Sequence, residues 1–545
     1  MNIIYLILIS ILGLGLRLIG INKFQGLWND EYISWFVASH PLRGGFIKEM
    51  LAQCHMPFYY LYLKFCMHFG GDSDLFLRLT SVAVGVLGII VMYFVGAQHS
   101  RKSGYLCAVF AALSSFLIYY SQEVRMYSLL FLISALALFY LLRFLKNKSW
   151  VNLLGLVVFD FLIVFTHTIG FVFVFFQLVG LSVLLFKEYK KQLIAIWGVL
   201  LLSGLLCLPQ ILKIIITQSF SQWWGHFSLS KIGFLFTDYF SPVLTNLVNA
   251  PDNMLYVKSV SFVIFTFVPA IIAIGFIIRS LFKNEESRLH QVLLGICVGF
   301  IAVLSGAAIL GKLVFITKYS IEIYPILLYL AVVGACAFSH KKIASFFVGL
   351  FCIINLTYIF ISPVSAPKMP RVQGHKIVAD LLEKGKPQEG DFIILEYYPQ
   401  SRFEKYFDFS KYKVFSIDKG AFPSFLSSNV DYAQVLANGK DLYKNVFAES
   451  GPAHIDYMLL TTVLQNIKPN QSVFVVMLDS VSMYSPKDME TIVKDDYLYQ
   501  KTPIMYLIFS YIKNRTFIDL SKSLAVTRYE KMGDWSIVKF TKLNK

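Results

Sequence analysis

The chain has 545 residues, of which 57% are hydrophobic, 16% aromatic and only 15% charged. This apolar share, with a mean hydropathy of +0.62, excludes an ordinary soluble domain and predicts a polytopic membrane protein. The formal net charge of +16 could indicate nucleic-acid binding, but the basic residues lie in short clusters between apolar runs. They therefore predict membrane topology, with no nucleic-acid partner. The seven cysteines form no C-x-x-C pair and favour neither a disulfide framework nor a zinc site.

Hydrophobic runs predict about eleven membrane-spanning helices, if roughly 20 residues cross a bilayer. The predicted spans are residues 3–20, 75–97, 104–120, 124–142, 150–167, 169–186, 193–212, 257–282, 290–310, 318–338 and 343–362. With a cytoplasmic N-terminus, every loop on the inner side is basic, as the positive-inside rule requires. These loops carry Arg101, Lys102, Arg143, Lys146, Lys148, Lys187, Lys190, Lys191, Arg279, Lys283, Arg288, Lys341 and Lys342. We therefore predict a multi-pass protein of the cell inner (plasma) membrane.

After residue 362 the apolar runs end and the chain changes character. The polar helical stretch Gly374–Lys386 is followed by the strand-like runs Asp391–Tyr397 and Ser472–Leu478. This part contains no P-loop, dinucleotide fingerprint or metal motif. The sequence predicts a transmembrane domain over residues 1–362 and an extracytoplasmic α/β domain over residues 363–545.

Ionisable residues from separate stretches of sequence collect at the predicted outer boundary of the membrane. They are Asp30, Glu31, His55, Glu123, Arg125, His167 and Lys318. Such groups cost free energy at a membrane boundary unless they are paired or line a wet pocket. Their gathering on one side predicts that they share one cavity.

Six stretches of the chain resemble a known family in their order and motifs. They are WNDEYIS (28–34), HMPFYYLYLKF (55–65), GDSDLFLRL (71–79), YYSQEVRMYSLL (119–130), FTHTIGFVF (165–173) and TKYSIEIYP (317–325). Together they resemble glycosyltransferase family 39-like proteins, which are integral-membrane enzymes of the GT-C fold related to protein O-mannosyltransferases and aminoarabinose transferases. The chain departs from the family pattern at Met56, where a second proline is common, and at Lys318, where an arginine is common.

The resemblance implies a reaction: a sugar moves from a polyprenyl phosphate carrier to a hydroxyl of a lipid, glycan or protein acceptor at the outer face, with inversion. The acceptor must lose a proton, and the departing phosphate gains negative charge. By resemblance Asp30 is the base, and Glu31 holds the acceptor or the polar end of the pocket. Glu123 matches the second acidic position of the family and would orient the sugar or a basic partner.

The same resemblance assigns the donor phosphate to basic residues. His55, Arg125 and Lys318 are the candidates, and the planar fork of Arg125 suits a phosphate group. Tyr127 and Tyr319 are expected to complete the substrate-binding set. Because the leaving group is a lipid phosphate at the membrane interface, we expect neither a cofactor nor a divalent metal to be required.

Each candidate also has a structural interpretation. Asp30 and Glu31 could be a solvated loop start or a charge pair at a helix N-terminus. Arg125 could snorkel to the membrane boundary or pair with Glu123. Lys318 could be an interfacial anchor.

Two histidines and a further arginine are also open to structural interpretations. His55 could cap a juxtamembrane helix, and His167 is expected to be a hydrogen-bonded histidine inside the bundle. Arg17 is expected to snorkel or to pair with an acidic loop residue.

Two functions of other classes fit the composition. One is a transporter or flippase of lipid-linked sugars, and the other is a non-catalytic envelope glycan-binding membrane protein. A transporter would tend to place charges near the membrane midplane and to show internal repetition. Neither feature is found in the sequence, which favours the enzyme.

Overall fold

The computed structural model describes most of the chain in thirteen segments of sequence. These are residues 3–21, 26–52, 56–217, 227–242, 260–282, 286–310, 315–338, 341–361, 375–397, 403–418, 467–478, 524–532 and 535–542. The chain divides into two compact units. The helical unit comprises Met1–Lys23 and Ile33–Pro370, and the sheet unit comprises Phe24–Tyr32 and Arg371–Lys545.

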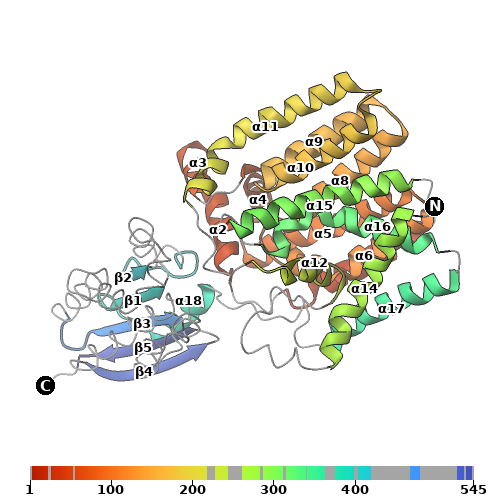
Figure 1. The fold of residues 1–545 in the computed structure, drawn as a ribbon. Helices are drawn as coiled ribbons and strands as arrows, with labels where there is room; N and C mark the ends of the chain where they lie inside the picture. Colours follow the sequence, from red (N-terminus) through yellow and green to blue (C-terminus); the bar gives the residue numbers. More distant parts are fainter. Residues whose placement is uncertain are drawn as a thin grey trace. The chain divides into compact units, whose positions relative to one another are not determined.

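The first half of the helical unit is a succession of apolar helices joined by short connections (Figure 1). Its elements are α1 (Ile3–Leu18), α2 (Asn29–Ser39), η1 (Leu42–Phe46), α3 (Ile47–Ala52), α4 (Pro57–Gly70), α5 (Asp74–Ala97), α6 (Arg101–Leu113), α7 (Ser115–Ser121) and α8 (Tyr127–Lys146). The second half comprises α9 (Trp150–Thr166), α10 (Gly170–Leu185), α11 (Lys190–Thr217), α12 (Ser230–Phe240), α14 (Val260–Phe282), α15 (Ser287–Ile309), η3 (Thr317–Ile323), α16 (Tyr324–Cys336) and α17 (Lys341–Ile361).

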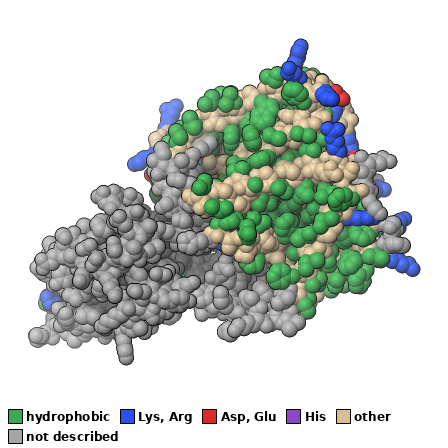
Figure 2. Space-filling model, viewed as in Figure 1, with side chains coloured by type: hydrophobic (Ala, Val, Ile, Leu, Met, Phe, Trp, Pro, Cys, Tyr) green, Lys and Arg blue, Asp and Glu red, His purple; other side chains and the backbone are tan. Residues whose placement is uncertain are grey.

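Every predicted span overlaps one of these helices or an adjoining pair. Among the described residues, 6 helical stretches are long and apolar enough to cross a membrane, or 7 if the bent pair α6–α7 counts as one. Figure 2 shows a broad apolar face on the helical unit, with Lys and Arg side chains gathered at its rim. Leu201 and Leu205 on α11, Ile271 on α14 and Val298 on α15 are among the exposed apolar side chains. The protein is therefore a mostly helical, multi-pass membrane protein.

Helix α16 forms the centre of the helical unit. Every residue from Tyr324 to Ala335 is buried, and the helix packs against α14, α6, α8, α5 and α15. A helix that is apolar on all sides is expected to be surrounded by other helices. The short helix η3 leads directly into α16, and five of its residues are buried in the bundle: Thr317, Ser320, Ile321, Glu322 and Ile323.

The predicted span 104–120 is not one straight helix. It is two helices, α6 and α7, bent by 59°. Ser114 between them has an extended backbone (φ −61°, ψ 112°), and its hydroxyl accepts a hydrogen bond from the Leu117 N–H at 3.3 Å. Serine can end one helix and cap the next because its side chain replaces a lost backbone partner.

Arg17 donates hydrogen bonds to residues on both sides of the break between α6 and α7. The expectation that it snorkels or pairs with a loop carboxylate is therefore wrong. Its side chain is fully buried. The guanidinium donates to the carbonyls of Ala111 at 3.1 Å and Ala112 at 3.3 Å, and to the Ser121 hydroxyl at 3.1 Å. In return, the Gln122 side-chain amide donates to the carbonyl of Arg17 at 2.9 Å. The end of α1 and the α6–α7 break thus satisfy each other's backbone groups.

The sheet unit contains a small mixed sheet and a helix. Its elements are α18 (His375–Gly385), β1 (Phe392–Tyr397), β2 (Lys413–Asp418), β3 (Ser472–Leu478), β4 (Ala525–Met532) and β5 (Trp535–Thr541). The strand order is β2-β1-β3-β5-β4. β1 is parallel to β2 and β3, whereas β5 is antiparallel to β3 and β4. The helix and strands predicted around residues 374–397 and 472–478 are confirmed.

Apolar residues of α18 pack on one face of this sheet. The helix contacts β3, β4 and β5. The core between them is built from Leu381, Leu382, Ile393, Phe403 and Phe474, among others. Alternate residues of a strand lie in this core, such as Phe474 and Val476 of β3, because successive side chains of a strand point to opposite faces of the sheet.

Candidate active site

Asp30 and Glu31 lie in the first turn of α2, so of the two structural interpretations the structure shows the helix N-terminus and not a loop start. Carboxylates are favourable there because the helix N-terminus carries partial positive charge. Glu31 is fully buried, and its Oε2 accepts a hydrogen bond from the Trp28 N–H at 3.2 Å. This is the glutamate half of a capping box. Asp30 is half-buried, with part of its surface accessible.

Helix α2 is shared between the two units of the chain. Its first turn, up to Tyr32, belongs to the sheet unit, and the remainder from Ile33 belongs to the helical unit. The turn that carries Asp30 and Glu31 is therefore grouped with residues far along the chain.

Glu123 and Arg125 lie in the turn between α7 and α8. The sequence places this turn in an outer loop, but the two side chains are only 2% and 5% exposed. Arg125 Nη1 donates to the Ser34 hydroxyl of α2 at 3.3 Å. Snorkelling to the membrane boundary is therefore wrong for Arg125, because its guanidinium lies inside the helical unit.

Lys318, Tyr127 and Tyr319 come together where η3 approaches the start of α8. Lys318 Nζ lies 5.5 Å from the ring centroids of both Tyr127 and Tyr319. An ammonium over aromatic faces is a stabilising arrangement. Lys318 and Tyr319 are half-buried, whereas Tyr127 is almost completely buried. The lysine is thus held by the bundle, which an ordinary interfacial anchor would not require.

Three buried polar contacts hold η3 in place. Of the residues that form them, only His167 was singled out by the sequence analysis. The Thr317 hydroxyl donates to Asp238 Oδ2 of α12 at 2.6 Å. The Tyr239 hydroxyl donates to the Ser320 carbonyl at 2.5 Å. These bonds join η3 to α12, because each polar group needs a partner once it is buried.

The third contact pairs a histidine with a carboxylate. His167 Nδ1 lies 3.1 Å from Glu322 Oε1, and both side chains are buried. The His167 ring lies 5.8 Å from that of Tyr319. The prediction of a hydrogen-bonded histidine inside the bundle is confirmed, and its partner is a carboxylate on the same short helix as Lys318.

Two of the missed residues are the carboxylates Glu322 and Asp238, and the sequence contained a signal only for Glu322. Glu322 is a carboxylate inside a predicted span, and such a residue is a candidate for a functional or paired site by default. Asp238 lies in a stretch that reads as an outer loop, where an aspartate is unremarkable.

The structure brings some of the predicted site residues together and does not describe others. Tyr127, Lys318 and Tyr319 are neighbours, and Arg125 lies just before α8 in the same unit. His55 lies outside the described residues. The shared cavity remains a prediction.

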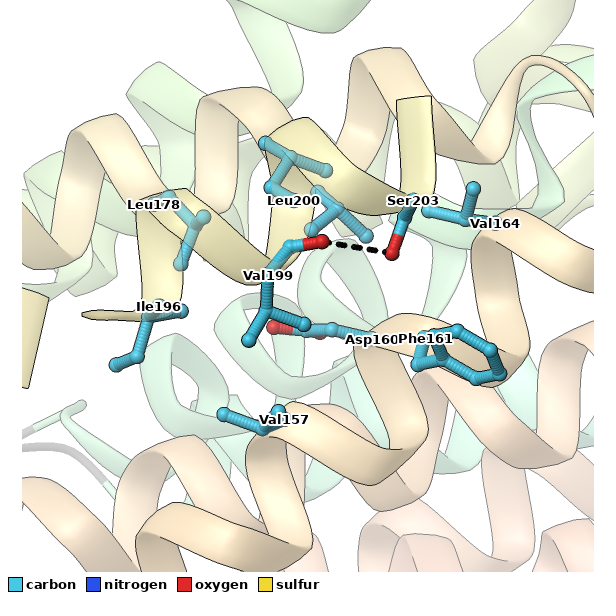
Figure 3. Close-up of a pocket in the computed structure, with 10 residues that line it drawn as sticks. Val157, Asp160, Phe161, Val164, Leu178, Ile196, Val199, Leu200 and Ser203 are labelled. Atoms are coloured by element: carbon cyan, nitrogen blue, oxygen red, sulfur yellow. Dashed lines mark hydrogen bonds between the residues drawn. The ribbon is translucent and has the colours of Figure 1, made fainter. Parts of the chain in front are cut away.

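A small hollow lies elsewhere in the helical unit, between α9, α10 and α11 (Figure 3). It is lined by apolar side chains, including Val157 and Leu200, together with Asp160 and Ser203. Gln177 Nε2 donates to Asp160 Oδ1 at 2.6 Å, and Ser203 donates to the Val199 carbonyl at 2.8 Å. None of the predicted site residues lines this hollow.

Comparisons with known proteins identify the class of fold. No protein-family model matches the chain, and no curated protein matches it significantly in sequence. Its fold is nevertheless shared with GT-C membrane glycosyltransferases.

The similarity extends along nearly the whole chain. The crystal structure of ArnT from Cupriavidus metallidurans in the apo state superposes with a TM-score of 0.54 and 9% identity, over 98% of this chain and 97% of that one. The apo oligosaccharyltransferase from Archaeoglobus fulgidus superposes with a TM-score of 0.50 and 12% identity, over 92% of this chain and 72% of that one. At these identities the likeness shows the fold.

Proposed function

We propose that the protein is an inverting glycosyltransferase that moves a sugar from a polyprenyl phosphate carrier to an acceptor hydroxyl at the outer face of the membrane. The observation that carries this proposal is the GT-C fold, shared with ArnT and an oligosaccharyltransferase over most of the chain. Fold alone does not fix function. The residues of the candidate site supply the chemical argument.

Asp30 is the proposed general base. Its carboxylate is only half-buried, so an acceptor hydroxyl can reach it, whereas Glu31 is buried and engaged at the helix start. A base that takes the acceptor proton in the transition state must lie within hydrogen-bond reach of that proton. Glu31 orients this turn, and Glu123 is proposed to orient the sugar or a basic partner.

The proposed ligands of the donor phosphate are Arg125, Lys318 and His55. Burial of Arg125 among helices places its guanidinium where few waters compete, which strengthens charge-assisted hydrogen bonds to a phosphate. The rings of Tyr127 and Tyr319 both contact the ammonium group of Lys318 and so fix its position. The negative charge that develops on the leaving phosphate is then stabilised by fixed protein groups.

We propose about eleven spans with a cytoplasmic N-terminus and an extracytoplasmic sheet unit. Single cysteines in a cysteine-free background, labelled with an impermeant reagent, test this topology. Positions 30, 230 and 450 should react from the outer side, and positions 101, 146, 188 and 284 from the inner side. Labelling of positions 30 and 450 from opposite sides would overturn the proposed outer site.

A reconstituted transfer assay tests the reaction itself. The acceptor class is found first, by mass spectrometry of envelope glycans and glycolipids from cells with and without the protein. Purified protein is then supplied with a polyprenyl phosphate sugar or with the matching nucleotide sugar, each with and without chelator. Transfer from the lipid donor alone, unaffected by chelator, is expected. Turnover with a nucleotide sugar would overturn the donor assignment, and loss of activity on chelation would overturn metal independence.

A further inference from the structure

Residues 26–32, which precede and include the first turn of α2, are bound to the sheet unit by their backbone. Leu27 is fully buried. Its N–H donates to the Tyr406 hydroxyl at 2.9 Å, and its carbonyl accepts from the His375 N–H at 3.2 Å. The bond from His375 uses a backbone donor at the start of α18, which has no partner within its own helix. Both backbone groups of Leu27 are thus satisfied by residues of the sheet unit.

Gly26 fits this contact only as a glycine. Its φ is +83°, a backbone conformation that other residues rarely adopt. A Cβ added there would lie 2.5 Å from Lys376 Cβ and 2.7 Å from Lys376 N. Because the second of these is a backbone atom of α18, the neighbour could move away only by shifting the helix.

A ring contact closes the segment on the other side of Asp30 and Glu31. Tyr32 is 1% exposed, and its ring meets that of His375 edge-on, with centroids 5.2 Å apart. The His375 ring in turn meets Phe403 at 5.3 Å. Phe403 belongs to the core of the sheet unit. The carboxylate turn is therefore anchored before and after the acidic pair.

Among the described residues, the core cluster of α18 and the strands is built from residues from Ile377 onward, and neither Leu27 nor Tyr32 is a member of it. The contacts of Gly26, Leu27 and Tyr32 are additional to that core. These contacts attach a segment from near the N-terminus to the C-terminal residues of the sheet unit.

We propose that the C-terminal sheet unit positions the catalytic carboxylate: Tyr406, His375 and the backbone of Lys376 clasp residues 26–32 and so set the first turn of α2. This proposal rests on the proposed role of Asp30. The clasp residues act through Asp30 and touch no substrate themselves. A displacement of about 1 Å of a reacting group can reduce a rate by about 10²-fold.

The test compares Tyr406→Phe and Gly26→Ala with Tyr412→Phe in the full-length protein in nanodiscs. Tyr406→Phe keeps the ring and removes only the oxygen that accepts the Leu27 N–H. Tyr412 is half-buried in the same unit, and its ring stacks on Phe407, so its hydroxyl is a matched control. Hydrogen exchange is read at residues 26–32 and, separately, over α18 and the strands.

Faster exchange confined to residues 26–32 is expected in both clasp variants. The maximal transfer rate should fall, by about 10-fold in Tyr406→Phe and about 10²-fold in Gly26→Ala. The donor KM should stay unchanged, since the proposed phosphate ligands belong to the other unit. Tyr412→Phe should match the wild type. In an Asp30→Asn background, Tyr406→Phe should lower the rate no further, because the group that it positions is already lost.

Two results would overturn the clasp. One is wild-type exchange at residues 26–32 in Tyr406→Phe and Gly26→Ala. The other is faster exchange there with an unchanged maximal rate. If Gly26→Ala fails to fold, Tyr406→Phe decides alone. Full activity of Asp30→Asn would instead remove the proposed base, and the exchange data would still show whether the sheet unit holds this segment.

Discussion

The two regions that carry the proposed catalytic groups are held in different ways: residues 26–32, which include Asp30, and the short helix η3, which includes Lys318. Residues 26–32 are fixed by backbone hydrogen bonds to Leu27 and by a glycine without room for a side chain. The short helix η3 is fixed by buried side chains, through Thr317 and Glu322. Conservative substitutions near Asp30 should therefore alter chemistry with little cost in stability. Substitutions that remove the anchors of η3 should alter both.

The largest effect is expected from Asp30→Asn. Removing a general base lowers rates by about 10²- to 10⁴-fold. The free energy of unfolding should change by no more than about 0.5 kcal/mol, because the side chain is half-buried and the change nearly isosteric. Initial rates and thermal unfolding in nanodiscs measure the two quantities. Asp380→Asn, at a half-buried aspartate on α18, is the control. Activity within a few-fold of wild type would shift the base to Glu31 or Glu123.

The contrasting change in η3 is Glu322→Ala. It removes the partner of His167 inside the bundle, and breaking a buried pair costs about 3 kcal/mol or more. We expect a lower unfolding temperature together with weaker donor binding, because Lys318 and Tyr319 lie on the same short helix. Glu322→Gln keeps an oxygen for His167 and should be milder. Glu188→Ala, at an exposed site, should leave stability unchanged. If Glu322→Ala also left stability unchanged, the proposed difference between the two parts would be wrong.

A smaller effect is expected from Arg125→Lys. An ammonium group cannot reproduce the two parallel hydrogen bonds of a guanidinium on a phosphate. We expect the donor KM to rise by about 10-fold, which corresponds to about 1.4 kcal/mol, with thermal stability close to that of the wild type. Arg143→Lys, at an exposed position, should change neither quantity. A silent Arg125→Lys combined with failure of Arg125→Ala to accumulate would identify the residue as structural.

The smallest effect concerns Glu286, which directly precedes α15 (Ser287–Ile309) and pairs with His99. A hydrogen bond from His99 lowers the pKa of Glu286, and the positive charge of Lys146 acts in the same direction, against the effect of partial burial. A lowered pKa means that Glu286 contributes its full stabilisation above the ordinary glutamate range and loses it as the pH falls from that range through the lowered pKa.

Glu286→Gln should therefore cost less than about 1 kcal/mol at neutral pH, since the side chain is partly exposed. The difference from wild type should begin to shrink at about pH 4.3, the ordinary glutamate pKa, and should disappear only below the lowered pKa of Glu286. Thermal unfolding at pH values from 7 down to below this range measures it, with the exposed Glu383→Gln as control. A difference that grew on acidification would contradict the direction of the pKa change.

The sequence predicted the positions of the helices well because each apolar run carries a strong signal, although α1, α9 and α10 are shorter than the predicted spans. It could not predict the break at Ser114, since one serine within an apolar run is compatible with a continuous helix. The burial of Glu123 and Arg125 was also hidden, because a short polar stretch between apolar runs reads as an exposed loop. Whether such a stretch lies inside the bundle depends on contacts with distant residues, such as Ser34, that leave no local pattern.

The contact between the first loop and the C-terminal domain was equally invisible to pattern analysis. Leu27 meets Tyr406 across 379 positions of sequence. Periodicity and turn signals describe neighbours along the chain, so they carry no information on such a pairing. Gly26 was the one local signal, since a glycine beside a functional turn can mark a close approach of backbones.

The bonds of Arg17 have a consequence for the order in which the protein is assembled. The first apolar helix enters the membrane with a guanidinium near its end, and an arginine at the centre of a membrane helix costs about 2.5 to 3.5 kcal/mol. Its partners, Ala111, Ala112 and Ser121, are synthesised much later. We therefore expect α1 to stay shallow or exchange with water during early synthesis. Its final depth would be fixed only when α6 and α7 arrive, so deleting those helices should leave α1 poorly retained in the bilayer.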